Sequence, residues 1–412
     1  MTNNPRYTLG TEANRIFMAS ETYELLKFGK GFPAPDGGSG WLNADGTLDP
    51  SHGVETWITS RMAHVYSVGA MLGYPGAGEL ADAALKGLTG ILHDDEHGGW
   101  YPQVFADGTH APGKVCYAHA FVILAASSAL LAGRPGAKEL LDEALATYDE
   151  HFWDDEIGLA VDTWDTAFTA LDPYRGLNAN MHTTEAFLAV ADATGNNTYR
   201  VRAGRIIDHV IEWAAHNRWR IPEHFKSDWS LDLECNADKK DDQFKPYGAT
   251  PGHGIEWARL ITQWATSTYP NDPATAAPYI EAAEHLFNRA VEDAWNADGA
   301  PGIVYTTDWD GKPVVHDRMH WTLAEGINTA STLARVTGKE SYAKWYATFL
   351  EYADSTVMDH VNGSWFHQLD RANQPIGTVW PGKSDLYHAT QSMMIPLRDP
   401  SLSIAPAAKK QG

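Results

Sequence analysis

The chain has 412 residues, a mass of 45.3 kDa and a formal net charge of −22, because 53 Asp and Glu outnumber 31 Lys and Arg. Hydrophobic residues make up 43% and charged residues 20% of the sequence, which excludes a mostly disordered chain. The acidic balance argues against nucleic acid and anionic membranes as partners, since both repel negative charge.

The two cysteines and the amino-terminal residues give information on the cellular location of the protein. Cys116 and Cys235 are too few and too far apart for a disulfide scaffold or a thiolate metal site, which fits a reducing cytoplasm. The first residues lack the basic and then apolar pattern of a secretory signal. The longest apolar run, 121–131, is broken by serines and is shorter than the ~20 residues that span a bilayer. We therefore expect a soluble, cytoplasmic protein.

A helix is expected at about 16–27, and one pattern then repeats along the chain. Each unit has a short Gly- and aromatic-rich segment that is typical of a β-hairpin or an extended turn. Marker residues in these segments are 59, 59, 70, 74 and 61 residues apart, so six units account for nearly the whole chain. The segments are 38–46, 97–108, 157–166, 228–238, 301–311 and 362–373.

Two kinds of helix are expected between the hairpins. After each hairpin comes a stretch rich in Ala, Gly, Ser and Thr, which suits a helix packed on all sides. A more amphipathic helix follows before the next hairpin, for example at 137–153, 199–215 and 279–295. The small-residue stretches are 58–73, 115–133, 182–195, 252–267, 320–338 and 385–397.

Two helices in each of six units predict twelve helices, with the small-residue set inside and the amphipathic set outside. This is an all-α fold, an (α/α)6 barrel, in which residues 1–412 form one catalytic domain and short β-hairpins rim the mouth. An open solenoid of stacked helix pairs is the alternative. The first unit has only an outer helix before its hairpin and the last inner helix lies near the carboxyl end, which favours a closed ring.

Polar residues stand at equivalent places near the start of the six inner helices, separated by 56, 65, 71, 67 and 68 residues. In a closed ring these positions converge on one mouth, where helix amino ends favour an anionic reaction centre. The residues are Arg61, Tyr117, His182, His253, His320 and His388.

Three acidic residues share a helix face with these positions. His182 with Glu185 and His253 with Glu256 are spaced i,i+3, and Trp321 with Glu325 is spaced i,i+4. A carboxylate beside an imidazole fixes its orientation and raises its basicity, although a helix-surface ion pair has the same spacing.

No cofactor is expected from the motifs. There is no HExxH, and the close histidine pairs at 93–97 and 316–320 lack its glutamate, so we expect no metal. Nucleotide-binding GxGxxG and GxxxxGK[ST] motifs and a GxSxG elbow are also missing from the sequence.

Five segments in order resemble the N-acylglucosamine 2-epimerase superfamily, and within it the bacterial aldose–ketose isomerases that act on mannose and related hexoses, including the sulfoquinovose isomerases. The resemblance runs from about Arg61 to Gln391 and is more specific for the superfamily than for the substrate. The segments are RMAHVY (61–66), NANMHTTEAFLAV (178–190), TPGHGIEWARL (250–260), MHWTLAEG (319–326) and LYHATQ (386–391).

The resemblance implies an (α/α)6 barrel that works without metal or organic cofactor on a monosaccharide. It also implies that His253 and His388 are the acid/base pair, with Glu256 and Glu325 tuning or positioning them. The positions that bind sugar hydroxyls and ring would be Arg61, Tyr117, Asn178, His182 and Trp321. Sulfonate-specific members need further side chains for which we see only possible stand-ins, Gln243, Gln368 and Lys383, with Ser384 at a place where Gln is expected.

We therefore expect an enzyme that interconverts D-mannose and D-fructose. The reaction opens the sugar ring, removes the proton from C2 and returns a proton to C1 through an enediol, and a histidine can do both. In this hypothesis His388 acts at carbon, while His253, oriented by Glu256, opens the ring and moves protons between O1 and O2. Arg61 stabilises the enediolate oxygen. The reverse assignment of the two histidines stays open.

Other functions compete with this one. A 2-epimerase of N-acylglucosamine or cellobiose type would reprotonate C2 on the opposite face, and a sulfoquinovose isomerase would share the chemistry. A glycoside hydrolase would use paired carboxylates, for which Asp165, Asp228 and Glu325 are candidates. A non-catalytic sugar-binding protein would not need the carboxylates of Glu256 and Glu325. The oligomeric state, monomer or small homo-oligomer, is not predicted.

Overall fold

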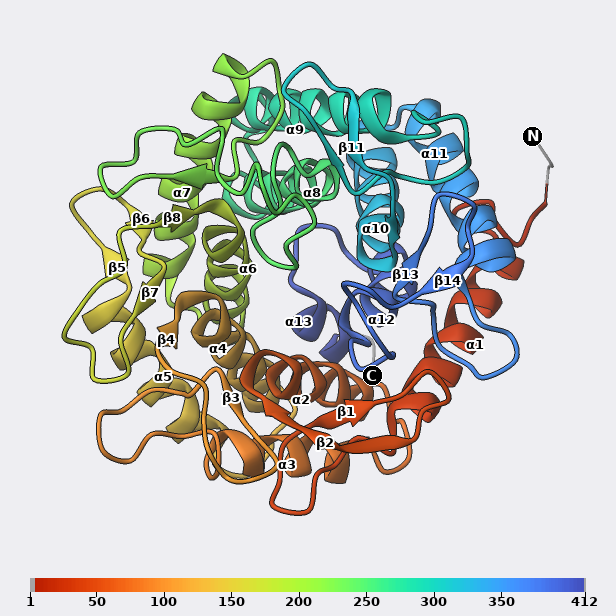
Figure 1. Cartoon of the computed structure of the whole chain (residues 1–412). Helices are drawn as coiled ribbons and strands as arrows, with labels where there is room; N and C mark the ends of the chain where they lie inside the picture. The colour runs from red at the N-terminus through yellow and green to blue at the C-terminus, as the bar shows by residue number, and fades with distance from the viewer. Residues whose placement is uncertain (1–3, 411–412) are drawn as a thin grey trace.

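Six inner helices surround a central axis and six outer helices surround them in turn (Figure 1). The structure is a computed structural model that describes residues 4–410, so the two ends of the expected domain, 1–3 and 411–412, lie outside the described residues. The inner helices are α2 (Thr56–Met71), α4 (Cys116–Leu131), α6 (Leu177–Thr194), α8 (Pro251–Thr268), α10 (His320–Thr337) and α12 (Tyr387–Met394). The outer helices are α1 (Glu12–Gly29), α3 (Ala77–Leu88), α5 (Ala137–His151), α7 (Asn197–His216), α9 (Pro273–Ala294) and α11 (Glu340–Tyr352).

The ring is closed, which confirms the (α/α)6 barrel and rejects the open solenoid. Each inner helix packs against the next, and α12 packs against both α1 and α2, the first helices of the chain. Such contact between the last and first units does not occur in an open stack.

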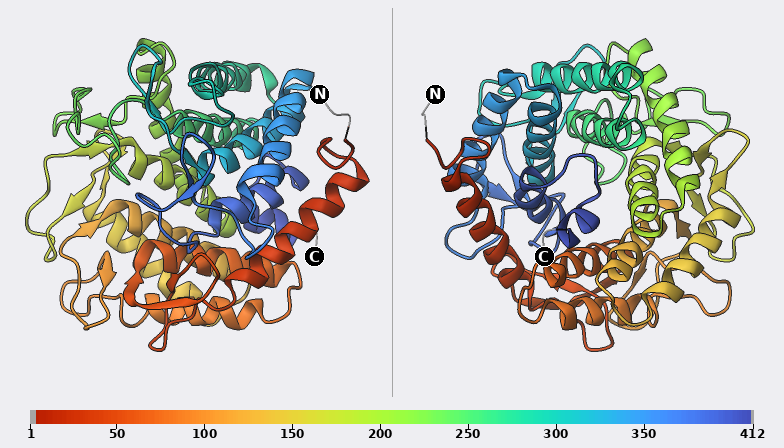
Figure 2. Two further views of the ribbon diagram at one scale, coloured as in Figure 1. Left: turned by 45° about the vertical axis from the view of Figure 1, so that its right-hand side comes forward. Right: turned by 180° about the vertical axis from the view of Figure 1, so that it is seen from behind.

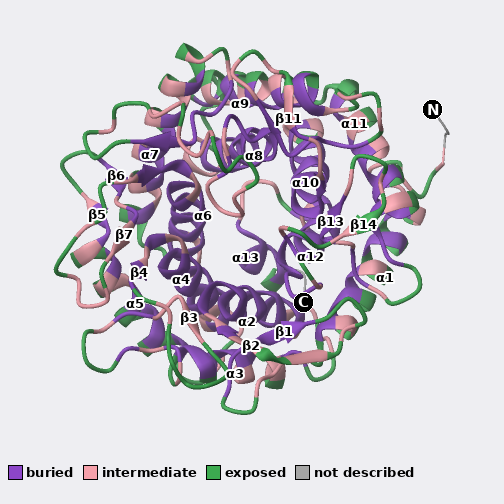
Figure 3. Cartoon of the chain, in the orientation of Figure 1, coloured by how far each residue is buried: buried purple, intermediate pink, exposed green. Residues whose placement is uncertain are grey.

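Residue size explains which helices lie inside. In α4 nearly every residue from Cys116 to Ala129 is buried, because Ala and Ser let neighbouring helices approach on all sides. The outer helix α7 buries only one stripe, which includes Ile206, Ile207 and Val210. Figure 3 shows this division, with buried inner helices and exposed residues on the outside of the ring.

Short strands connect successive units at the rim of the mouth. They are β1 (Gly40–Leu42), β2 (Leu48–Glu55), β3 (Gln103–Val104), β4 (Lys114–Val115), β5 (Trp153–Asp154), β6 (Leu159–Ala160), β7 (Thr163–Trp164), β8 (Arg175–Gly176), β9 (His224–Phe225), β10 (Thr306–Thr307), β11 (Pro313–Val315), β12 (Arg318–Met319), β13 (Gln368–Leu369) and β14 (Pro375–Ile376). Every predicted hairpin segment takes part in at least one antiparallel pair or bridge.

The segment before each inner helix pairs with the hairpin of the next unit. Antiparallel pairs join β2 to β3, β4 to β7, β8 to β9 and β12 to β13, and a bridge joins Ala249 to Thr307. The series closes where the backbone N–H of Lys383 donates to the carbonyl of Leu42 at 2.9 Å. The starts of all six inner helices are therefore fixed relative to one another.

The carboxyl-terminal segment lies across the far end of the ring, as the view from behind shows (Figure 2). After α12 the chain forms η2 (Ile395–Leu397) and α13 (Ile404–Lys409), and α13 packs against α2, α4 and α6. A π-helical turn, η1 (Ala353–Val357), ends the last outer helix. In residues 4–410 no helix has the length and apolar character needed to cross a membrane.

Candidate active site

The mouth of the ring contains a small cleft. Every inner helix contributes to its wall, and three loops add aromatic and amide side chains. The lining residues are Arg61, Tyr117, Asn178, His182, Gln243, Phe244, His253, Glu256, Tyr305, Trp321, Trp380 and His388. All the expected site residues except Glu325 and His320 are thus brought together on this wall.

His388 and Glu325 form a buried pair on neighbouring helices. Nδ1 of His388 lies 3.0 Å from Oε1 of Glu325, whose side chain is fully buried. Because a carboxylate only accepts, Nδ1 carries the proton and Nε2 is left as the basic nitrogen. Burial, with Arg61 nearby, lowers the pKa of His388 well below its usual value, so the ring is neutral.

His253 is held by a residue that the sequence analysis did not identify. Its Nδ1 lies 2.9 Å from Oε2 of Glu223, which is buried just before β9 and also accepts the backbone N–H of Thr250 at 3.3 Å. The expectation that Glu256 orients His253 is therefore wrong. The i,i+3 spacing places both on one side of α8, but the partner of Glu256 is Arg259 at 3.4 Å.

His182 and Glu185 make the expected contact, with Nδ1 of the histidine 3.4 Å from Oε2 of the glutamate. Burial lowers the pKa of His182 to about 4, against the opposing effect of Glu185. Glu185 also accepts the hydroxyl of Tyr387, the residue before His388. The His182 and His388 segments are thus connected through one carboxylate.

Trp321 contacts both of the expected acid/base histidines. Its ring centroid is 5.0 Å from that of His253 and 5.8 Å from that of His388. Glu325, which shares the Trp321 face of α10, is bonded to His388 on α12 and to Asn328 on its own helix. An indole in this position offers a flat apolar surface of the kind on which sugar rings stack.

His320 does not line the cleft, so its expected place at the mouth is wrong. Its ring stacks on that of His367 at a centroid distance of 4.1 Å, and its backbone N–H donates to the His367 carbonyl at 3.0 Å. One residue along an α-helix is a rotation of about 100°, and it is the next residue, Trp321, that faces the cleft.

Arg61 is positioned by a buried carboxylate that was also not expected. Its Nη1 lies 2.6 Å from Oδ2 of Asp385, and its Nη2 donates to the hydroxyl of Tyr117 at 2.8 Å. Both Arg61 and Asp385 are almost fully buried. Asn178, on α6, donates to the carbonyl of Phe244 at 3.4 Å and so contacts a loop that lines the cleft.

A cluster of three glutamates around one arginine forms the floor of the site. Arg259 lies 2.8 Å from Glu325, 3.4 Å from Glu256 and 3.8 Å from Glu185. Ligand-type atoms of His182, Glu185 and Glu256 lie within 4.8 Å of one another, as do those of Glu256, Glu325 and His388. Arg259 supplies one positive charge to this group of three carboxylates.

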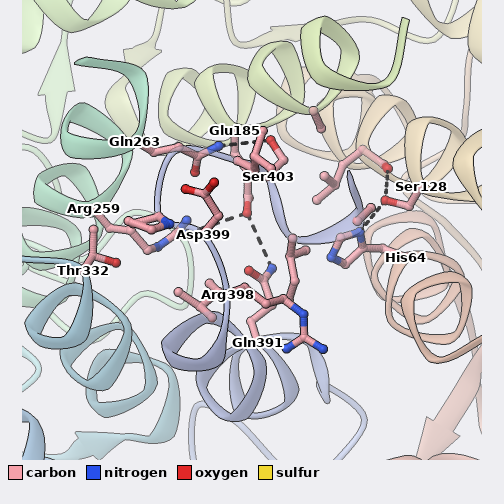
Figure 4. A pocket seen from close by; sticks show the side chains of 17 residues that line it. His64, Ser128, Glu185, Arg259, Gln263, Thr332, Gln391, Arg398, Asp399 and Ser403 are labelled. Atoms are coloured by element: carbon pink, nitrogen blue, oxygen red, sulfur yellow. Dashed lines mark hydrogen bonds and ion pairs between the residues drawn. The ribbon is translucent and has the colours of Figure 1, made fainter. Parts of the chain in front are cut away.

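A second cavity lies behind this floor, between the inner helices and the carboxyl-terminal segment (Figure 4). Arg259 and Gln391 approach Glu185 there, the latter at 3.5 Å, so Glu185 belongs to both sides of the floor. His64 contacts Ser128 at 2.7 Å, and Gln263 donates to Ser403 at 3.0 Å.

Three side chains considered for a sulfonate have structural partners instead. The Gln368 amide donates to Asp317 and Thr378, Lys383 forms a buried ion pair with Asp359, and Ser384 accepts from the backbone of Leu42. Gln243 does line the cleft. Among the described residues of the wall, Arg61 is the only cationic side chain, and it is already paired.

The carboxylates considered for glycoside hydrolysis do not come together. Asp165 and Asp228 are exposed and bond to nearby turn residues, Thr169 and Ser230. Two acids across a glycosidic bond must lie ~5–9.5 Å apart in one cleft. The structure thus removes two of the three candidates for a hydrolase.

A closed ring of six helix hairpins with a histidine-lined cleft at its mouth defines the class of fold and site. The chain belongs to the N-acylglucosamine 2-epimerase family, whose sequence model matches residues 37–392. A D-mannose isomerase of Thermobifida fusca is 44% identical over 403 residues, which cover 97% of this chain and 98% of that protein. One of Pseudomonas cannabina pv. alisalensis is 40% identical over 400 residues, which cover 97% and 96%. A crystal structure of D-mannose isomerase superposes with a TM-score of 0.85 at 26% identity, covering 93% of this chain and 97% of that one.

Proposed function

We propose that this enzyme is an aldose–ketose isomerase that interconverts D-mannose and D-fructose through an enediol. The observation that carries the proposal is a pair of histidines that both contact Trp321, each with Nδ1 bonded to a buried carboxylate. Both rings therefore keep Nε2 for chemistry, as acid/base catalysis at adjacent sugar atoms requires. The two D-mannose isomerases at 40% and 44% identity support the same substrate.

His388 is the proposed base at carbon. Its neutral ring removes the C2 proton of the open-chain aldose and delivers a proton to C1, an effect worth ~10²–10⁴ in rate. Glu325 holds the ring in the required tautomer and stabilises the imidazolium that forms. His253, held by Glu223, is proposed to open the sugar ring by proton transfer at the ring oxygen and O1.

The other groups on the wall are proposed to bind the sugar. Arg61 faces the developing enediolate oxygen, and its ion pair with Asp385 keeps the guanidinium in place. Tyr117, Asn178 and His182 offer hydrogen bonds to hydroxyls, and Trp321 stacks on the chain or ring. Because the wall holds one paired cation, a neutral hexose fits it better than a sulfonated sugar.

Product analysis by NMR, starting from D-mannose, tests this function. We expect D-fructose as the main product. D-glucose as the main product would show that the enzyme is a 2-epimerase. Much faster conversion of sulfoquinovose than of mannose would show that it is a sulfoquinovose isomerase. Binding of mannose without conversion would indicate a sugar-binding protein.

Several further properties stay predictions from the sequence. They are activity without a metal ion, a cytoplasmic location and a single catalytic domain over residues 1–412.

A further inference from the structure

The floor of the site holds three carboxylates but one guanidinium. Glu185, Glu256 and Glu325 are nearly or fully buried, and Arg259 approaches all three. Three charges of one sign within a few ångströms in a buried site are not sustained by one opposite charge. At least one of the three is therefore expected to carry a proton.

Counting hydrogen-bond donors shows which carboxyl group this is. Glu325 accepts from Arg259 at 2.8 Å, from His388 at 3.0 Å and from Asn328 at 3.2 Å. Glu185 accepts from Tyr387, His182 and Gln391. Among residues 4–410, the donor within hydrogen-bonding distance of Glu256 is Arg259 alone, at 3.4 Å. Glu256 has the least stabilised anion of the three.

Glu256 also lies where a proton is useful. It lines the cleft. A carboxyl oxygen of Glu256 lies within 4.8 Å of a ring nitrogen of His182, and a carboxyl oxygen of Glu256 lies within 4.8 Å of a ring nitrogen of His388. The Nδ1 of His253 is taken by Glu223, so Glu256 has no role in orienting that ring. Its carboxyl group is free to face a substrate oxygen bound between the histidines.

We propose that Glu256 is a neutral carboxylic acid in the resting enzyme and is the catalytic residue that moves protons between O1 and O2 of the open-chain sugar. This inference rests on the proposed isomerase function. As His388 takes the proton from C2, Glu256 gives its proton to the aldehyde oxygen O1, and an enediol forms. As His388 returns a proton to C1, the Glu256 carboxylate takes the proton from O2, and the ketose forms. Both residues end in their starting protonation states.

The charges around Glu256 agree with this assignment. Burial raises the pKa of Glu256 well above its usual value, Glu325 and Glu185 raise it further, and Arg259 and Arg61 oppose the shift less strongly. The neighbouring residues His182 and His388 are neutral, so they supply no positive charge that would lower the pKa of Glu256. The acid form is lost only as the pH rises through this raised pKa.

The protonation state is tested by stability, without reference to activity. Glu256→Gln replaces one neutral group by another, so the urea midpoint should stay at or above that of the wild type. Glu325→Gln is the matched control, because it removes the ionised partner of Arg259 and should lower the midpoint. A Glu256→Gln midpoint lowered as far as that of Glu325→Gln would overturn the proposal.

The catalytic role is tested by comparing exchange with isomerisation in deuterium oxide. Glu256→Gln should lower fructose formation by ~10²–10⁴-fold. Deuterium entry at C2 of mannose should fall less, because it does not need the later proton transfer from O2 that completes the ketose. The ratio of exchange to isomerisation then rises. A parallel fall of both rates would overturn the role. Failure of the isomerase function itself is recognised separately, since the wild type would then form no ketose.

Discussion

Nδ1 of His253 lies 2.9 Å from Oε2 of Glu223, a residue thirty positions earlier in the chain. Glu325 supports His388 in the same way at 3.0 Å, although it comes from a neighbouring helix. The site therefore contains two imidazoles in the same tautomeric state, each supported by its own buried carboxylate. The two pairs differ in what surrounds them, since Glu325 belongs to the Arg259 cluster and Glu223 does not.

Removing the charge of Glu223 should impair the reaction more than sugar binding. We expect Glu223→Gln to lower kcat by about 10–100-fold with KM changed only a few-fold, because the amide no longer stabilises a protonated His253. Steady-state rates on mannose test this. Glu212→Gln, an exposed change on the outer helix α7, is the control and should stay within two-fold of the wild type. Equal effects of the two variants would contradict the role of Glu223.

The low pKa of His388 predicts activity in mildly acidic solution. A base must be unprotonated, and burial together with Arg61 lowers the pKa of His388 well below its usual value. In a plot of kcat against pH, the midpoint of the acidic limb should therefore lie clearly below ~6.5, which is the usual pKa of histidine. A profile that loses half its activity at or above that pH would contradict a buried neutral base.

Buried ion pairs hold two of the rim turns and should matter for stability. Lys383 lies 2.6 Å from Asp359 and donates to the Gly363 carbonyl at 2.8 Å, and Lys114 makes the same contacts with Asp94 and Gly98 in another unit. Lys383→Met should cost about 3–5 kcal/mol, because Asp359 is left as an unpaired buried charge. Lys344→Met, at an exposed pair with Glu340, should cost about 0–1 kcal/mol in the same urea titration.

The same ion pairs predict how stability depends on acid. Burial alone would raise the pKa of Asp359, but the contact with Lys383 and backbone N–H groups holds it at about 2, and Asp94 is held at about 2 in the same way. A lowered pKa in the folded state adds stability at neutral pH, and this stability is lost as the pH falls from ~4 towards 2. Urea midpoints across this range should fall less steeply for the Lys383→Met variant than for the wild type.

Activity is expected to survive removal of divalent cations. The carboxylates nearest to the histidines already share Arg259, and Asn328 and Tyr387 donate to two of them. Dialysis against a chelator should leave the rate on mannose within two-fold. A loss that is restored by adding one divalent cation would show that His182, Glu185 and Glu256, or Glu256, Glu325 and His388, bind a metal.

The repeat in the sequence was enough to predict the ring and most of its cleft. Equivalent positions near the start of each inner helix must face one mouth once the ring closes, and Arg61, Tyr117, His182, His253 and His388 do. The predicted place of His320 at the mouth was wrong because such spacing defines a helical position only to within one residue. A shift of one residue turns the side chain by about 100° around the helix.

The supporting carboxylates were harder to predict because they come from other units. An i,i+3 spacing shows that Glu256 and His253 share a face but not that Arg259 is the nearer partner. Glu223 lies in the irregular segment between α7 and β9, and Asp385 lies in the one before α12. No periodicity marks a buried acid in either segment. Their roles depend on the pairing of one unit with the next, which the rim strands establish.

Hydrogen exchange at carbon tests the central claim most directly. With mannose in deuterium oxide, the wild type should place deuterium at C1 of fructose and at C2 of the remaining mannose, as NMR can measure. His388→Ala should abolish both while sugar binding stays within a few-fold. Exchange at either carbon that persists in His388→Ala would contradict the assignment of this histidine as the group that moves the carbon-bound proton.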